Sequence, residues 1–333
     1  EEWRQLLVRN SSIQEKFELL DLKKYIAGAI NDVLEKKFQP IKKFDLSYKD
    51  LLKKDPKIQK REFRVGIAQI GVSQSSDILT EFYYETSPGF FRLKEDKVQI
   101  ILKKVKTMVE TASNNGVNIL LFPELAIDLN YLQLYEALLN LAKKHNLYIV
   151  PGSYHNQKTK QNISSVISPD GILWEQEKHI PAMIHFEGNL IKESIDVNTY
   201  PRKTVVCNTE YGRIAIIICR DFLDLDLRVE LKNFDPPIDL LFNPAFTPVA
   251  ADFRAAHFDA RRSIYAYCFF ANIAEFGDSL IYTPEKERTE QKILPKEEKL
   301  IYKDVDIFKL RSERKKWELE QKKDKPFIQS TKY

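Results

Sequence analysis

The chain has 333 residues, of which 43% are hydrophobic and 30% are charged. It is long and apolar enough for a large core, and its composition is too polar for a membrane protein. No apolar run reaches the roughly eighteen residues that a transmembrane helix needs, so we expect no association with a membrane. The 52 basic and 48 acidic residues leave a net charge of +4 on a mixed surface, so nucleic acid is expected only through a fused partner.

Residues 1–61 differ in pattern from the rest and are predicted to form a helical extension and linker. The stretch "IQEKFELLDLKKYIAGAINDVLEKKF" has apolar residues at helical spacing, and "KKDPKIQKR" is typical of a connector. The opening "EEWRQLLVRN" lacks a starting methionine and an apolar signal core. We therefore expect a fragment, a processed product, or one part of a longer polypeptide with a covalently linked upstream domain.

From residue 62 to residue 310 the pattern predicts alternating strands and helices. Strands are expected at 63–72, 117–125, 147–155, 213–219, 238–246, 266–274 and 277–284, with a hairpin over 163–180 that turns at Pro-Asp-Gly. Helices are expected at 93–116, 132–146, 225–233 and 251–265. Several strands are apolar on both faces, which indicates an α/β protein with buried sheets. Residues 311–333 form a charged tail, for which a solvated helix is favoured over a binding arm.

Three chemically active side chains follow apolar strands. Glu124 ends "NILLFPE", Lys178 ends "ILWEQEK" and Cys219 ends "IAIIIC". Because functional crevices of α/β sheets lie at the carboxyl ends of strands, these side chains are expected to converge. A thiol attacks a carbonyl or nitrile carbon once a base takes its proton, so Glu124 could be the base and Lys178 the donor to the oxyanion. Lys178 would also favour the thiolate.

The three cysteines are sparse and odd in number, which argues against a disulfide framework and for a reducing, cytoplasmic compartment. Cys219 alone could be an ordinary buried thiol, but Glu124 and Lys178 favour the catalytic interpretation. Cys207 and Cys268 lie inside strand-like runs and are predicted to be core residues. The five histidines show no metal-ligand spacing, so no metal site is predicted. No phosphate-binding glycine motif is present, so no nucleotide site is predicted either.

The ordered combination of short motifs resembles the nitrilase, or carbon–nitrogen hydrolase, superfamily. The matches are "LLFPE", "EQEKHI" and "IAIIICRD", supported by "RVGIAQI" before them, "NISSVISPDG" between them, and "LLFNPAF" and "GDSLIY" after them. The resemblance covers about residues 62–310. It implies an α-β-β-α sandwich and a Glu124–Lys178–Cys219 triad without metal or organic cofactor.

The resemblance also implies a second glutamate that braces the lysine. Glu193 in "LIKESID" is favoured, and Glu187 in "HFEGN" is the alternative. Members of the superfamily usually pair through helices, so a homo-oligomer is expected, with contacts around 222–233 and 252–264. Members also occur in fusions, including fusions with reverse-transcriptase-like proteins of bacterial defence systems.

The chain departs from the superfamily pattern at two places near the expected site. Arg220 follows the cysteine, either as an ion-pair partner of Asp221 or Asp224 or as a contact for an anionic substrate group. Phe246 could line the pocket or belong to the core. An aromatic-rich insertion, residues 73–92, is predicted to cover the pocket or dock a neighbouring domain, and the alternative is a local aromatic cluster.

The predicted function is hydrolysis of a non-peptide C–N bond through a cysteine thioester. The small-molecule substrate is expected to be an amide or carbamoyl compound rather than a nitrile. The alternatives are acyl transfer to an acceptor other than water, and a regulatory or assembly module with little or no hydrolase activity.

Overall fold

The structure is a computed structural model that describes residues 26, 43–53, 57, 59–75, 77–186, 188–197, 201–285 and 291–323. The chain divides into two compact units, Glu1–Lys42 and Lys43–Tyr333, and nearly all of the described residues belong to the second. Most of the predicted N-terminal helical extension therefore lies outside the described residues.

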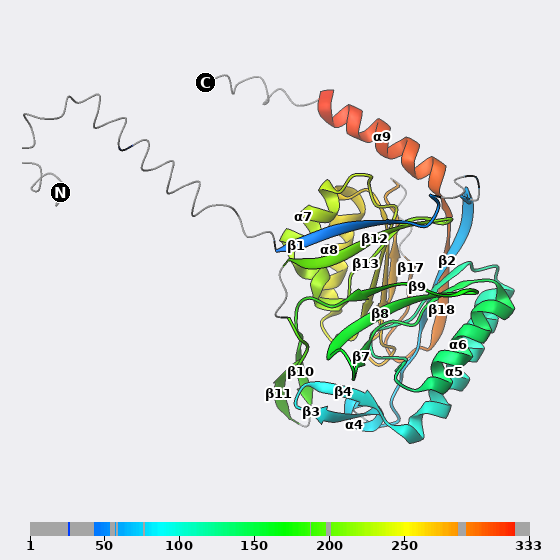
Figure 1. Cartoon of the computed structure of the whole chain (residues 1–333), viewed down its shortest axis with the longest axis vertical. Coiled ribbons are helices and arrows are strands. Elements are labelled where there is room, and N and C mark those ends of the chain that lie inside the picture. Colours follow the sequence, from blue (N-terminus) through cyan, green and yellow to red (C-terminus); the bar gives the residue numbers. More distant parts are fainter. Residues whose placement is uncertain are drawn as a thin grey trace, which may run out of the picture. The chain divides into compact units, whose positions relative to one another are not determined.

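Two sheets form the centre of the second unit (Figure 1). The first sheet has the strand order β1 (Phe44–Asp50), β12 (Arg202–Thr209), β13 (Gly212–Ile216), β14 (Leu240–Ala245), β15 (Tyr267–Asn272), β16 (Leu280–Tyr282) and β17 (Gln291–Lys292). The second has the order β18 (Lys299–Asp306), β2 (Glu62–Gln69), β5 (Ile119–Leu121), β6 (Tyr148–Val150), β8 (Gln161–Ser168) and β7 (Tyr154–Asn156), with β9 (Gly171–Glu177) paired to β8. The hairpin predicted at Pro-Asp-Gly is the β8–β9 pair.

Helices cover the outer faces of both sheets, which confirms the predicted α-β-β-α sandwich (Figure 1). The second sheet is covered by α5 (Glu95–Asn114) and α6 (Leu132–His145), and the first by α7 (Leu225–Asn233) and α8 (Ala250–Ser263). Side chains alternate across a strand, so Ile119 and Leu121 pack between the sheets while Leu120 packs against α5 and α6. Both faces of such a strand are apolar for that reason.

Residues 44–50 form the edge strand β1, so the helix-and-linker prediction is wrong there. β1 pairs in parallel with β12, with Phe44 opposite Arg202. Its sequence "FDLSYKD" alternates apolar and polar residues, which is a strand signal, but the flanking lysine-rich stretches resemble a linker. The edge position, paired on one side only, explains why most of its side chains are exposed.

The last described helix, α9 (Ile307–Lys323), begins before the predicted start of the tail at residue 311. Its Arg311 donates to the buried carboxylate of Asp239 at 2.7 Å, and Arg314 donates to it at 3.2 Å. The first turns of α9 are thus fixed to the sandwich, while the tail's last ten residues, 324–333, lie outside the described residues.

The aromatic insertion is a packed helix and hairpin, formed by α4 (Ile78–Phe82), β3 (Tyr83–Ser87) and β4 (Phe90–Leu93). Among its aromatic residues only Tyr84 is exposed, at 40%, while the others in the group are buried: Phe82, Tyr83, Phe90 and Phe91. Most of the aromatic area therefore already has a partner within the chain. A second small hairpin pairs β10 (Met183–Phe186) with β11 (Asn189–Lys192).

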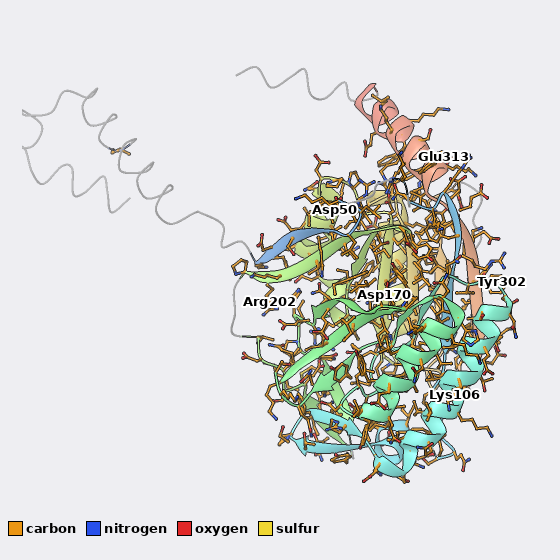
Figure 2. The ribbon with its side chains drawn as sticks, turned by 45° about the vertical axis from the view of Figure 1, so that its right-hand side comes forward. Asp50, Lys106, Asp170, Arg202, Tyr302 and Glu313 are labelled. Carbon is orange, nitrogen blue, oxygen red and sulfur yellow. The ribbon has the colours of Figure 1, made fainter. Side chains whose placement is uncertain are left out.

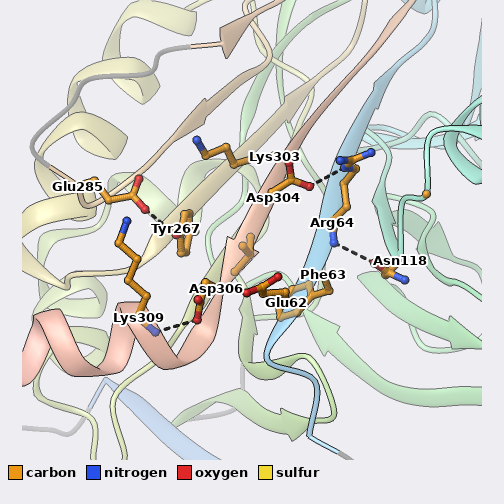
Figure 3. Close-up of a pocket in the computed structure, with 12 residues that line it drawn as sticks. Glu62, Phe63, Arg64, Asn118, Tyr267, Glu285, Lys303, Asp304, Asp306 and Lys309 are labelled. Atoms are coloured by element: carbon orange, nitrogen blue, oxygen red, sulfur yellow. Dashed lines mark hydrogen bonds and ion pairs between the residues drawn. The ribbon is translucent and has the colours of Figure 1, made fainter.

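Other surface features can be located in the remaining views. Figure 2 shows Lys106 on the outer helix α5 and Asp170 at the β8–β9 turn. A cavity of about 530 Å³ lies beside β2 and β18, where Arg64 pairs with Asp304 at 2.7 Å and Tyr267 donates to Glu285 at 2.8 Å (Figure 3).

Across the described part of the chain, no helix is long and apolar enough to span a membrane.

Candidate active site

The four residues predicted for catalysis line one cavity of about 680 Å³. Glu124 follows β5, Lys178 follows β9 and Glu193 follows β11, while Cys219 is the first residue of the 3-10 helix Cys219–Leu223. All four side chains are almost completely buried. The sandwich therefore brings together groups that are far apart in the sequence.

Lys178 lies between two carboxylates. Its Nζ donates to Glu124 Oε1 at 2.8 Å and to Glu193 Oε2 at 2.7 Å. The amide of Asn162 on β8 donates to the same two groups, at 2.8 Å to Glu124 Oε1 and 2.8 Å to Glu193 Oε1. Asn162 was missed by the sequence analysis, although an asparagine inside a fully buried strand is a detectable signal, because such groups need partners.

Glu193 is held by two further donors. Its Oε1 accepts from His155 Nε2 at 2.9 Å, and its Oε2 accepts from the backbone amide of Ala182 at 2.8 Å. Glu193 therefore contacts Lys178 in the way predicted for the bracing carboxylate. Glu187, the alternative, lies outside the described residues.

Glu124 lies in the cavity with both the lysine and the cysteine. Its Oε2 accepts from the backbone amide of Phe246 at 3.0 Å, and its carboxylate raises the pKa of the Cys219 thiol, which lines the same cavity. A thiol, a carboxylate and an ammonium group thus lie in one cavity, where proton transfer from sulfur to a general base needs them.

The charges of the cluster favour a neutral thiol. Burial raises the pKa of Cys219 well above its usual range, and the Glu124 carboxylate raises it further, while Lys178 lowers it. Burial also opposes the charge of Lys178, but Glu124 and Glu193 outweigh it and hold the lysine pKa well above its ordinary value. Lys178 favours the thiolate as predicted, but burial and the Glu124 carboxylate outweigh its effect on the pKa of Cys219.

The backbone of Cys219 is in the left-handed region, with φ 45°. This conformation costs a non-glycine residue roughly 1–2 kcal/mol and persists only where neighbours hold it. Asn243 Nδ2 donates to the Cys219 carbonyl at 3.3 Å, and Asn243 Oδ1 is 3.0 Å from Nε2 of the buried His257. Burial lowers the pKa of His257 to about 3, so this histidine stays neutral. Asn243 was not among the residues predicted from the sequence.

Asp221 fixes the segment that follows the lysine. Its carboxylate accepts from the backbone amides of His179 at 2.8 Å and Ile180 at 2.7 Å. Asp224 instead accepts from Leu227 N as the cap of α7. Within the described residues neither aspartate pairs with Arg220, so the ion-pair alternative for this arginine is wrong.

Comparison with known proteins decides the family. The sequence profile named carbon–nitrogen hydrolase matches residues 93–315, about two thirds of the chain. The chain belongs to the carbon–nitrogen hydrolase family. No curated protein sequence matches it.

Solved structures of nitrilase-superfamily proteins have the same fold as this carbon–nitrogen hydrolase. The NitFhit protein of C. elegans has a TM-score of 0.60 at 15% identity, covering 79% of this chain and 65% of its own. Nit3 of Saccharomyces cerevisiae, described as a member of branch 10 of the nitrilase superfamily, has a TM-score of 0.55 at 16% identity, covering 83% of this chain and 98% of its own. A mutant amidase of Nesterenkonia sp. AN1, which shows Michael addition of acrylamide at its active-site cysteine, has a TM-score of 0.53 at 13% identity, covering 78% and 99%.

The cavity of this carbon–nitrogen hydrolase is lined mainly by apolar side chains around the polar cluster. Arg220 is exposed on its wall, with one long contact of 3.5 Å to the Pro181 carbonyl. Phe246 also lines it, and its ring meets that of Tyr83 edge to face at 6.0 Å. Asp77 and Leu79, from the aromatic insertion, complete part of the wall. The insertion therefore contributes to the pocket wall.

Proposed function

We propose that the protein hydrolyses the C–N bond of a small amide or carbamoyl compound through a thioester on Cys219. The observation that carries this proposal is the buried cluster in one cavity, where Lys178 bridges Glu124 and Glu193 and the Cys219 thiol lines the same space. The Cys219, Glu124 and Lys178 side chains supply a nucleophile, a base and an oxyanion donor without a metal or organic cofactor.

In the first half of the reaction the sulfur of Cys219 attacks the carbonyl carbon while Glu124 takes the thiol proton. The negative charge that forms on the carbonyl oxygen is stabilised by the Lys178 ammonium group, and one such preorganised donor is typically worth about 3–4 kcal/mol. Glu124 then gives its proton to the nitrogen, and the C–N bond breaks. The amine leaves, and the acyl group stays on Cys219 as a thioester.

In the second half, water loses a proton to Glu124 and attacks the thioester carbon. The tetrahedral intermediate again places its charge beside Lys178. When it collapses, the C–S bond breaks, the carboxylic acid leaves, and the sulfur recovers its proton from Glu124. Each proton taken by Glu124 is thus returned within one half of the cycle.

Arg220 and Phe246 are proposed to contact the part of the substrate that does not react. Arg220 is exposed on the cavity wall and can meet an anionic group. Exposed apolar residues on α7, together with the usual pairing of the superfamily, support a homo-oligomer. A cytoplasmic location is proposed as well, because the three cysteines are sparse and odd in number.

Mass spectrometry of the intact protein tests the proposed function. We expect acrylamide to add one equivalent to Cys219, and simple aliphatic amides to release ammonia with the wild-type protein. Cys219→Ser should abolish both, while Cys207→Ser, which alters a thiol buried in the core, should retain both. A wild-type protein that neither forms the adduct nor releases ammonia would support the alternative of a regulatory or assembly module.

A further inference from the structure

His155 connects the aromatic hairpin to the catalytic cluster. It lies on β7, its side chain is fully buried, and its Nε2 is 2.9 Å from Glu193 Oε1. We propose that the β3–β4 hairpin, acting through His155, sets the position of Glu193 and thereby of Lys178. His155 is then a positioning residue, and this inference rests on the proposed function.

The hydrogen bonds of His155 define its tautomer. The backbone amide of Phe91 donates to Nδ1 at 2.8 Å, so Nδ1 is an acceptor and carries no proton. The ring proton therefore lies on Nε2, which donates to Glu193. Protonation of Nδ1 would remove the Phe91 contact, so the hairpin backbone keeps this donor directed at the carboxylate.

Glu193 uses all of its acceptor capacity. A carboxylate has about four lone-pair directions, and four donors fill them here. They are His155 Nε2 and Asn162 Nδ2 on Oε1, and Lys178 Nζ and Ala182 N on Oε2. Removing His155 leaves one direction of a buried carboxylate empty and allows Glu193 to rotate, so that Lys178 can follow it away from the cavity.

The hairpin holds His155 from several sides. The ring of Phe90 stacks on the imidazole, with centroids 4.6 Å apart and planes at 26°. Outside the hairpin, in the segment between β5 and α6, Asn130 Nδ2 also donates to the His155 carbonyl at 2.8 Å. The Gly89 carbonyl accepts from the backbone amide of Ser194 at 2.9 Å, next to Glu193 in the chain. One hairpin therefore contacts both the histidine and the segment that carries the bracing carboxylate.

Variants of His155 separate the donor from the ring. His155→Gln keeps an N–H donor toward Glu193, whereas His155→Phe keeps a stacking ring without any donor. We expect kcat to fall roughly 100-fold in His155→Phe, as for a catalytic group that is misplaced by about 1 Å, with KM little changed. His155→Gln should recover most of that loss. His145→Gln, the same change at a histidine of α6 that contacts Ser113, is the matched control and should match wild type.

The pH profile distinguishes positioning from a general loss of structure. The charged and titratable groups around Glu193 are Lys178, His155, Asp221, the Glu124 carboxylate that shares Lys178 with it, and Cys219 in the same cavity. Burial raises the pKa of Glu193, but Lys178 and His155 together hold it well below its usual range. His155→Phe should therefore move the acid limb of kcat to higher pH, and His155→Gln should move it back.

Nitrogen NMR of the wild-type protein tests the tautomer without relying on any variant. The result expected is a neutral His155 with its proton on Nε2 and a hydrogen-bonded Nδ1. A proton on Nδ1, or an imidazolium at neutral pH, would overturn the inference even if the variants do not fold. If the wild type turns over amides and both variants match it, the inference fails alone. If the wild type is inactive, the proposed function fails, while the NMR result still decides the geometry.

Discussion

Lys178 is the residue on which the buried charges of the site depend. It is the only cation that the described residues place between Glu124 and Glu193, both of which are almost completely buried. Lys178→Met should abolish turnover because the oxyanion donor is lost. It should also lower the free energy of unfolding by about 3–5 kcal/mol, because two buried carboxylates lose their counter-ion. Urea unfolding measures the loss, and an unchanged midpoint would contradict it.

Glu124 and Lys178 act on the Cys219 thiol in opposite directions. After burial, the Glu124 carboxylate is the main group that raises the pKa of Cys219, and Lys178 lowers it. Glu124→Gln should therefore lower the pKa of Cys219 while stopping turnover, since the thiolate becomes easier to form but the general base is gone. The ultraviolet absorbance of the thiolate, followed against pH, measures this. A pKa that rises in the variant would disprove the assigned charge balance.

Burial raises the pKa of Cys207 to about 12 and raises that of Cys268, as it does for Cys219, but of the three only Cys219 lines the catalytic cavity. Brief treatment with iodoacetamide should therefore label Cys219 much faster than the other two. Peptide mapping separates the three sites. Equal labelling of all three would remove the support for an accessible nucleophile.

Among the structural elements, the β3–β4 hairpin depends on one glycine. Gly89 has φ +76°, and a Cβ there would lie 2.1 Å from the Lys192 carbonyl oxygen. Gly116 has a similar φ of +68°, but the nearest atom to its Cβ is 3.9 Å away. Both alanine variants bear the left-handed cost of roughly 1–2 kcal/mol. Gly89→Ala should be destabilised further than Gly116→Ala, because its Cβ forces Lys192 at the end of β11 to move. It should also lose activity, because Glu193 follows directly after β11. Equal melting temperatures for the two variants would refute this close approach.

At the scale of the whole molecule, α7 presents apolar side chains to solvent. Leu225 is 63% exposed and Val229, one helical turn later, is 45% exposed. Single exposed apolar residues are common, but two on one helical face are typical of an interface. Light scattering should show at least a dimer, and Leu225→Glu with Val229→Lys should yield a monomer. Leu132→Lys, at a residue 64% exposed on α6, is the control. A wild-type monomer at micromolar concentration would exclude this contact.

Stability against acid should depend on Asp239. Burial raises its pKa, but Arg311, Arg213 and Arg314 outweigh it and hold the pKa below the usual range. Because the pKa of Asp239 is lower in the folded protein than in the unfolded one, its carboxylate stabilises the fold at pH values above the unfolded pKa of about 4. This stabilisation is lost as the pH falls through the folded pKa. Asp221 acts in the opposite direction, because burial raises its pKa to about 8. Asp239→Asn should therefore flatten the fall in unfolding free energy below about pH 5. Urea titrations of both proteins at several pH values measure it, and parallel curves would contradict the assignment.

The sequence pattern by itself determined an α/β protein with buried sheets and three catalytic candidates, and the family resemblance implied the sandwich. Strands such as 119–121 are apolar on both faces because one face meets helices and the other meets the opposite sheet. Glu124, Lys178 and Cys219 could be identified because each ends a predicted strand, and functional crevices of α/β proteins lie at strand ends. The strands belong to two sheets, which the sandwich brings together. The resemblance to a known family added Glu193.

Only the tertiary structure decided which groups hold these residues. Asn162, His155 and Asn243 contact the site through partners distant in the chain, and no spacing in the sequence reports such contacts. The same holds for β1, whose alternating pattern forms a strand only because it pairs with β12. The paired residues Phe44 and Arg202 are 158 positions apart in the sequence. Local pattern is encoded in neighbouring residues, whereas hydrogen bonding across the fold depends on which strands become neighbours in space.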